Sequence, residues 1–201
     1  MLLYLVRHGL TASNSGVIYA GRTNEPVSAE AGQAIETMTN FLLTCDISRI
    51  YSSPLLRTRQ TAEPLALHLK LPVETVSELT EMDVGPWAGL TGIEISATSS
   101  KEWATWRQTP FNMSLQGFED LPSVQKRALT WLCSLPVHAS PAAVFSHEAV
   151  IKVVLCALSG DSTRYRDLVV NNCSVQLIES YQFGKRVEWT LRAENLFAPG
   201  E

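Results

Sequence analysis

The sequence lacks the features that mark several large classes of protein. Its four cysteines are widely spaced and form no CxxC pair, so a zinc ribbon or a disulfide scaffold is a poor interpretation, and each cysteine is expected to be a small buried residue. It has no basic run, and 16 Lys and Arg stand against 20 Asp and Glu, a formal charge of −4. We therefore expect no nucleic-acid partner and no anionic membrane partner.

Long hydrophobic runs are also lacking. The first apolar run, residues 2–6, stops at Arg7 and follows no basic segment, so we expect a strand rather than a signal peptide. The strongest later run, residues 150–158, contains Lys152 and is far too short to span a bilayer. We expect a soluble, cytoplasmic protein, and 201 residues of which 45% are hydrophobic are typical of a globular chain.

Short apolar segments alternate with helical patterns along the chain. Strands are expected at residues 2–6, 47–52, 73–76, 142–146, 175–180 and 187–192, and helices at 28–42, 54–69, 119–135 and 147–158. This alternation predicts an α/β fold, a three-layer α/β/α sandwich with a mostly parallel central sheet. Residues 77–118 are irregular and rich in Gly and Pro. They are expected to form a lid or small insertion of loops and short helices within a single domain of residues 1–201.

Charged and imidazole side chains follow several of these strands. Arg7 and His8 come directly after the first strand, Arg57 falls in the first turn of the helix after the second, and His147 follows the strand at 142–146. Each has an ordinary structural interpretation when taken alone. Chemistry in such sheets gathers at the carboxyl ends of the strands, and helix N-termini and guanidinium groups favour anions. Their repetition therefore predicts an oxyanion site.

Other titratable groups are weaker candidates. Glu78 and Glu81 lie in the irregular segment after the third strand, and either could act as an acid. His68 follows an apolar helix and His138 lies in a loop flanked by proline. Neither histidine has a partner in the sequence, and both are interpreted as structural.

A set of short motifs occurs in a fixed order between residues 3 and 150. The motifs are Leu5-Val6-Arg7-His8-Gly9-Leu10-Thr11-Ala12-Ser13-Asn14, Gly21-Arg22-Thr23-Asn24-Glu25-Pro26-Val27-Ser28 with Gly32, Ser52-Ser53-Pro54 with Arg57, Gln60, Thr61 and Ala62, Glu81 with Gly85, Trp87 and Gly89, and Ser146-His147. In this order they resemble the histidine phosphatase superfamily, which is phosphoglycerate mutase-like. In size and general texture the chain is most similar to the α-ribazole phosphatases.

The resemblance implies a phosphoglycerate mutase-like fold and a metal-independent phosphomonoesterase that needs no cofactor. It implies that His8 attacks the phosphorus and forms a phosphohistidine, and that Glu81 protonates the leaving alkoxide and later takes a proton from water. The catalytic residues implied are His8, Glu81, His147, Arg7 and Arg57. The substrate-binding residues expected are Arg7, Thr11, Asn14, Arg22, Arg57, His147 and Glu148.

Three positions depart from the family pattern. Leu10 stands where relatives usually carry Glu or Gln, Ala88 where Glu is common, and Glu148 where Gly usually follows the second histidine. One hypothesis is that Glu148 faces the leaving group and disfavours substrates with a second anionic group. The alternative is that it points to solvent as a charge at a helix N-terminus.

The expected partner is a small phosphorylated metabolite, and α-ribazole 5′-phosphate of cobalamin biosynthesis is the leading candidate. Broad-specificity phosphatase, phosphoglycerate mutase-like activity and phospho-ligand binding without turnover remain alternatives. Aromatic residues of the lid would suit a flat leaving group if they face the cleft, although packing is the commoner role. These residues are Trp87, Trp103, Trp106, Phe111 and Phe118. An edge strand near the C-terminus could mediate a homodimer.

Overall fold

A six-stranded sheet forms the centre of the computed structural model, which describes residues 1–136, 140–183 and 186–198. The strands are β1 (Leu2–Arg7), β2 (Arg49–Ser52), β3 (Val73–Thr75), β4 (Ala142–Ser146), β5 (Val175–Phe183) and β6 (Arg186–Phe197). Their order is β3-β2-β4-β1-β5-β6. The first four strands run parallel, and β5 and β6 join antiparallel. The predicted, mostly parallel α/β sheet is confirmed.

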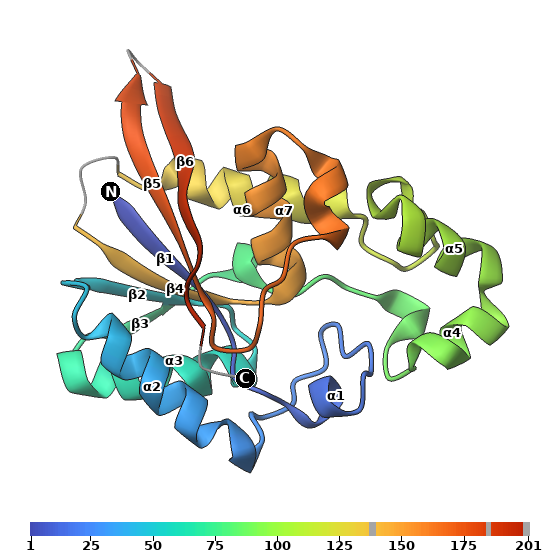
Figure 1. Ribbon diagram of the computed structural model, residues 1–201, viewed down its shortest axis with the longest axis horizontal. Coiled ribbons are helices and arrows are strands. Elements are labelled where there is room, and N and C mark those ends of the chain that lie inside the picture. Colours follow the sequence, from blue (N-terminus) through green and yellow to red (C-terminus); the bar gives the residue numbers. More distant parts are fainter. Residues whose placement is uncertain (137–139, 184–185, 199–201) are drawn as a thin grey trace.

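Helices cover both faces of the sheet (Figure 1). The helices α2 (Gly32–Leu42) and α3 (Leu56–Leu69) pack on one face, and α6 (Leu121–Ser134) and α7 (Glu148–Ser159) pack on the other. Strand β1 shows why both faces need cover: Leu3 and Leu5 join the core under α6 and α7, whereas Tyr4 and Val6 join the core under α2 and α3. Alternate residues of a strand point to opposite faces, so an uninterrupted apolar strand is buried on both.

The segment 77–118 consists of loops and short helices, as expected. These are η2 (Ser77–Leu79), η3 (Gly85–Trp87), α4 (Gly92–Thr98), α5 (Ser100–Gln108) and η4 (Pro110–Asn112). Figure 1 shows α4 and α5 at one end of the molecule, beyond the sheet. The backbone of Gly85 packs closely against that of Gly117, near the other end of the segment. A side chain does not fit there, because the φ of Gly85 is 49° and a Cβ would lie 2.3 Å from the Gly117 oxygen. The segment's role as a lid stays a prediction.

Several helices begin at other residues than the sequence predicts. A short helix, α1 (Ala12–Ser15), forms in the expected loop because Thr11 caps it through its side chain. Helix α3 begins at Leu56 rather than at Pro54. Leu55 precedes the helix with an extended backbone, and the Ser53 hydroxyl contacts His147 Nε2 at 2.8 Å and accepts from the Leu55 N–H.

The remaining elements extend or shift the predicted ones. A 3₁₀ turn, η1 (Ala29–Ala31), precedes α2, and a second, η5 (Ser162–Arg166), follows α7. Helix α6 begins after Asp120, which caps it through its carboxylate. Cys133 is exposed, so the expectation that every cysteine is buried was wrong for this helix position. Within the described ranges, no helix has both the length and the apolar character that crossing a membrane requires.

Candidate active site

The carboxyl ends of three neighbouring strands meet at one edge of the sheet. Strand β4 lies between β1 and β2, so the residues that follow these strands become neighbours. The His8 N–H donates to the Ser146 carbonyl at 3.1 Å, and the Ser53 N–H donates to the Phe145 carbonyl at 3.0 Å. These bonds fix the backbone of His8, Ser53 and His147 at a common edge.

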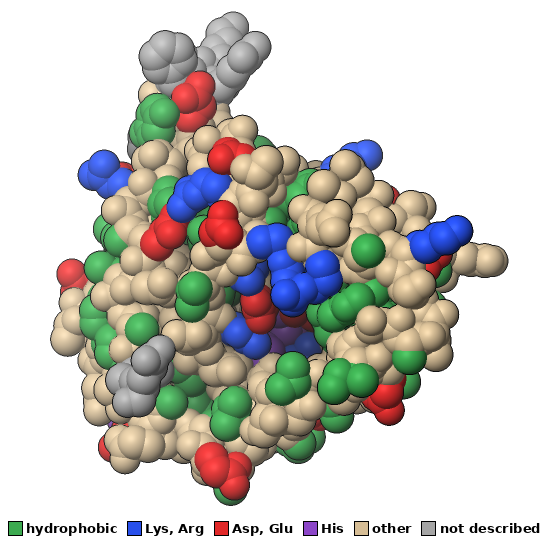
Figure 2. Space-filling view, turned by 45° about the vertical axis from the view of Figure 1, so that its right-hand side comes forward, with side chains coloured by type: hydrophobic (Ala, Val, Ile, Leu, Met, Phe, Trp, Pro, Cys, Tyr) green, Lys and Arg blue, Asp and Glu red, His purple; other side chains and the backbone are tan. Residues whose placement is uncertain are grey.

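A cavity of about 470 Å³ opens at this edge. Figure 2 shows a hollow with Lys and Arg side chains along its upper and left parts, hydrophobic side chains at its right and lower parts, and acidic and His side chains inside it. The charged side chains that line the cavity are Arg7, Arg57, Lys152, Arg166, Glu25, Glu81 and Glu148. His8 also lines it. The cavity therefore carries an excess of cations.

His8 is buried and held in one tautomer. Its Nδ1 lies 2.7 Å from the Gly9 carbonyl, which can only accept, so Nδ1 carries the proton and Nε2 holds the lone pair. Arg57 Nε donates to that Nε2 at 3.2 Å. Burial lowers the pKa of His8 well below its ordinary value, and the charges of Arg57 and Arg7 lower it further. The ring is therefore neutral and oriented, with the Nε2 lone pair directed toward Arg57.

Arg57 is a buried cation, only 2% exposed. Its Nη1 donates to the Thr23 carbonyl at 2.6 Å and its Nη2 to the Gly21 carbonyl at 2.9 Å. Both carbonyls belong to the loop before α2, so the guanidinium ties this loop to α3 and to His8. Burial lowers the pKa of Arg57, but a guanidinium stays charged in proteins. A buried cation held by neutral carbonyls is a strong attractor for an anion.

His147 lies behind His8 and does not line the cavity. The two ring centroids are 5.2 Å apart. The ring is fully buried, and its Nδ1 has no hydrogen-bond partner. Burial lowers the pKa of His147 well below its ordinary value, and the charges of His8, Arg57 and Arg7 act in the same direction.

Arg7 and Glu148 form an ion pair in the cavity wall. Arg7 Nη1 lies 2.9 Å from Glu148 Oε2, and Lys152 Nζ lies 2.7 Å from Glu148 Oε1. Burial alone would raise the pKa of the Glu148 carboxyl, but the charges of Arg7 and Lys152 outweigh it and lower that pKa. The alternative that Glu148 simply points to solvent is therefore wrong, since both of its oxygens pair with cations of the cavity.

Glu81 lines the same cavity as the cationic side chains Arg7 and Arg57. Its Oε1 accepts from the Met82 N–H at 2.8 Å. Burial raises the pKa of Glu81, and this outweighs the Met82 N–H and the charge of Arg57, which lower it. Arg22 does not line the cavity: its Nε donates to the Glu81 carbonyl at 3.1 Å and its Nη2 to Glu119 at 3.0 Å. Arg22 thus holds the Glu81 loop from outside.

Asn14 borders the cavity, and a residue that the sequence analysis missed holds it there. Asn172 Nδ2 donates to the His8 carbonyl at 2.9 Å and to Asn14 Oδ1 at 3.2 Å. The Thr11 hydroxyl contacts the same Oδ1 at 3.1 Å and Glu25 Oε1 at 2.9 Å; contrary to expectation, Thr11 is buried and does not line the cavity. Asn172 lies three residues before β5, and an antiparallel strand begins where its parallel neighbour ends. The signal that could have identified Asn172 is the order of the strands in the sheet, which sets the start of β5 beside the end of β1.

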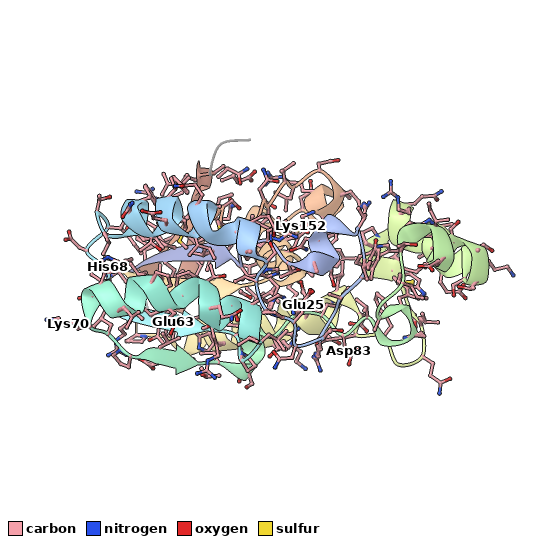
Figure 3. All side chains as sticks on the ribbon, turned by 90° about the horizontal axis from the view of Figure 1, so that it is seen from below. Glu25, Glu63, His68, Lys70, Asp83 and Lys152 are labelled. Atoms are coloured by element: carbon pink, nitrogen blue, oxygen red, sulfur yellow. The ribbon has the colours of Figure 1, made fainter. Side chains whose placement is uncertain are left out.

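Other candidates lie away from the cavity. Glu78 is half-buried, accepts from the Ser77 hydroxyl and does not line the cavity, so it does not compete with Glu81. His68 contacts the Pro64 carbonyl on the outer part of α3, at the far end of the molecule from Glu25 and Lys152 (Figure 3). His138 lies outside the described residues.

Most lid aromatics pack against one another instead of facing the cavity. Trp87 contacts Trp103 and Phe118 edge to face, with ring centroids 6.0 and 5.1 Å apart. Trp106 borders the cavity, and its indole N–H donates to the Tyr19 hydroxyl at 3.0 Å. Tyr19 and Tyr165 complete the aromatic part of the wall.

Together these groups can receive a tetrahedral oxyanion and act on it. Arg7, Arg57 and Asn14 supply donors, His8 supplies a lone pair, and Glu81 supplies a carboxyl whose raised pKa favours holding a proton. Arg7 lines the cavity, and its Nε is a buried polar atom without a partner among the described residues. His147 Nδ1 has no partner either, but His147 does not line the cavity. Among the described residues, no group of three His, Cys, Asp or Glu side chains could hold a metal ion.

Comparisons with known proteins agree with this chemistry. The family model described as the Histidine phosphatase superfamily (branch 1) matches residues 3–191. Phosphoserine phosphatase 1 of Hydrogenobacter thermophilus is 28% identical over 179 residues, covering 88% of this chain and 85% of that protein. The adenosylcobalamin/alpha-ribazole phosphatase of Escherichia coli is 24% identical over 163 residues, covering 80% of each chain. A solved structure, Mycobacterial hydrolase 1, has a TM-score of 0.88 at 22% identity, covering 98% of this chain and 99% of that one, which shows a shared fold.

The two lowered imidazole pKa values predict acid sensitivity of the fold. Near pH 6.5 the unfolded chain takes up protons on His8 and His147 that the folded chain refuses, so stability falls as the pH is lowered below 6.5. Each group contributes a slope of about 1.4 kcal/mol per pH unit between its unfolded and folded pKa values. Urea unfolding between pH 7 and pH 5 measures the slope, and His147→Gln should lower it by about half. A pH-independent unfolding midpoint would contradict the neutral-histidine assignment.

Proposed function

Since the chain belongs to the Histidine phosphatase superfamily (branch 1), we propose that it is a metal-independent phosphomonoesterase acting through a phosphohistidine on His8. Proteins with phosphatase names are among its relatives over most of its length, which supports phosphoric monoester hydrolysis as the reaction class. The observation that carries the mechanism is the unprotonated Nε2 of a buried, neutral His8 beside the cations of the cavity.

The phosphoryl group is bound first. Arg7 and Arg57 neutralise its charge, and Asn14 Nδ2 donates to one of its oxygens. The Nε of Arg57 now donates to the His8 lone pair, so a phosphoryl oxygen must take over this N–H before the ring can attack. Substrate binding therefore frees the nucleophile at the moment when it is needed.

Two displacements complete the reaction. In the first, His8 Nε2 forms a bond to phosphorus while the ester P–O bond breaks, and Glu81 donates its proton to the leaving alkoxide. In the second, a water attacks the phosphorus of the phosphohistidine, and the Glu81 carboxylate takes its proton. The P–N bond breaks, inorganic phosphate leaves, and His8 regains its lone pair. The cationic groups stabilise charge on the equatorial phosphoryl oxygens in both steps.

The leading substrate is α-ribazole 5′-phosphate. A relative with an α-ribazole phosphatase name supports it, as does the aromatic part of the wall. Tyr19, Trp106 and Tyr165 form the aromatic part of the wall that a flat leaving group would meet. The cavity of about 470 Å³ has room for more than a phosphoryl group.

A carboxylated phosphate ester is the second candidate, and Arg166 is the observation that favours it. Arg166 lines the cavity and is half-buried, and it forms no hydrogen bond or ion pair with another described residue. The other cations of the wall have partners there, as Lys152 has in Glu148. An unpaired guanidinium suits a carboxylate of the leaving group, and a relative named phosphoserine phosphatase 1 supports this class.

The first test is phosphate release in EDTA from four esters: α-ribazole 5′-phosphate, 3-phosphoglycerate, O-phosphoserine and p-nitrophenyl phosphate. We expect release from wild type and a loss of at least about 10³-fold in His8→Ala, because the nucleophile is gone. His68→Ala, which changes an exposed histidine of α3, is the matched control. A preference of tenfold or more in kcat/KM for one ester identifies the leaving-group class, and similar slow release from all four indicates broad specificity.

Two results would overturn the proposal. Release that needs a divalent metal would exclude the metal-independent route. Binding of the esters by wild type without any release would favour the non-catalytic alternative, in which the chain holds a phosphorylated ligand.

The role of Glu81 predicts a dependence on the leaving group. Glu81→Gln cannot donate a proton, so kcat should fall by about 10²–10⁴-fold for alkyl phosphates. The loss should be much smaller for p-nitrophenyl phosphate, whose stable phenolate leaves without protonation. For wild type on an alkyl ester, activity should fall as the pH rises and Glu81, whose pKa is raised above its ordinary value, loses its proton. Equal losses on both esters would assign the acid role elsewhere.

Arg166 provides the test between the two substrate classes. If the leaving group carries a carboxylate, Arg166→Gln should raise KM by about tenfold or more for that ester while kcat changes little, because a charge-assisted hydrogen bond is lost. Arg164→Gln is the matched control, since Arg164 lies on the same turn but pairs with Glu194 outside the cavity. An unchanged KM for both carboxylated esters would remove this class.

A further inference from the structure

The guanidinium of Arg7 has one nitrogen that is engaged and an edge without a partner. Its Nη1 donates to the Val170 carbonyl at 2.6 Å and forms an ion pair with Glu148, 2.9 Å from Oε2. Its Nε is buried and has no partner among the described residues. Nε–H and the nearer Nη2–H point the same way, as a two-pronged donor that matches two oxygens of a phosphoryl group.

Glu148 is itself fixed in place. It is the first residue of α7, and Lys152, one turn later on the same helix, holds its second oxygen at 2.7 Å. Lys152 in turn lies over the Tyr165 ring, 5.5 Å from its centroid. The carboxylate therefore bridges Lys152 and Arg7. The Glu148 side chain lines the cavity and is 39% exposed.

Resting on the proposed function, we propose that Glu148 is a positioning residue for phosphate recognition. By engaging Nη1 together with the Val170 carbonyl, it holds the Arg7 guanidinium in the orientation that presents the Nε and Nη2 edge to the phosphoryl group. Without this pair the long Arg7 side chain is anchored by a single carbonyl and can turn about it. A misplacement of the order of 1 Å is costly at such a site.

The same carboxylate has a second, opposite effect. Its negative charge lies in the cavity that must accept a phosphate dianion, so it lowers the attraction of the site for that anion. Orientation and charge can be separated by substitution. Glutamine keeps a side-chain oxygen at the place beside Arg7 Nη1 and removes the charge, whereas alanine removes both. The orientation effect predicts that alanine weakens phosphate binding and that glutamine does not.

The experiment measures binding of inorganic phosphate by calorimetry, and kcat and KM for p-nitrophenyl phosphate, in wild type, Glu148→Ala and Glu148→Gln. Glu63→Ala is the charge-matched control, because Glu63 is exposed on α3, away from the cavity (Figure 3). We expect the phosphate Kd of Glu148→Ala to rise by about tenfold or more. Glu148→Gln should bind phosphate as tightly as wild type or severalfold tighter, and Glu63→Ala should match wild type.

The outcomes distinguish this inference from the function on which it rests. A phosphate Kd for Glu148→Ala equal to or below that of wild type would overturn the positioning role, whatever the enzyme hydrolyses. Equal weakening in the alanine and glutamine variants would also overturn it, because the oxygen that glutamine keeps would then have no effect. Normal phosphate binding by wild type without hydrolysis would contradict the proposed function and leave the positioning role standing.

Discussion

The buried guanidinium of Arg57 is the constraint on which the site depends. A cation with 2% exposure is costly to bury, and its bonded partners are two backbone carbonyls and one imidazole nitrogen, none of which carries a full negative charge. The carbonyls of Gly21 and Thr23 can reach it because the loop before α2 folds over the start of α3. The fold therefore holds beside His8 a guanidinium that no carboxylate bonds, although the charges of Glu81 and Glu25 act on it. An anionic substrate can pair with it directly.

Several properties of the site follow from this charge. His8 and His147 stay neutral because burial and the nearby cations oppose their protonation. Neutrality leaves a lone pair on His8 Nε2, the atom that attacks in the proposed mechanism. At Glu81 burial outweighs those same cations, so its pKa is raised and the carboxyl can hold a proton. One buried edge of the sheet thus favours a neutral imidazole and a neutral carboxyl together, which is the pairing that the proposed mechanism uses.

The segment 77–118 supports the site chiefly through packing. Its tryptophans lie edge to face against one another and against Tyr19, which comes from the loop after α1. This cluster fixes the loop that carries Glu81, as does Arg22 from the outside. Sequence composition favoured packing for these rings but left open that some face a leaving group, because an aromatic residue in an irregular segment gives the same pattern whether it lines a cleft or fills a core. Of the predicted set, Trp106 borders the cavity.

By itself the sequence determined the strand and helix segments, the α/β class, and the ordered motifs that bring His8, Arg57, Glu81 and His147 to strand ends. Periodicity and capping are local, so residues near in the chain suffice to specify them. The tertiary structure decided the rest. Asn172 bonds the carbonyl of His8 across 164 residues, and Arg7 bonds Val170 across 163. Such contacts, like the pairing of Glu148 with Arg7, exist only once β4 pairs between β1 and β2 and β5 turns antiparallel. No local pattern encodes that order, because strand pairing is chosen by the packing of the whole core.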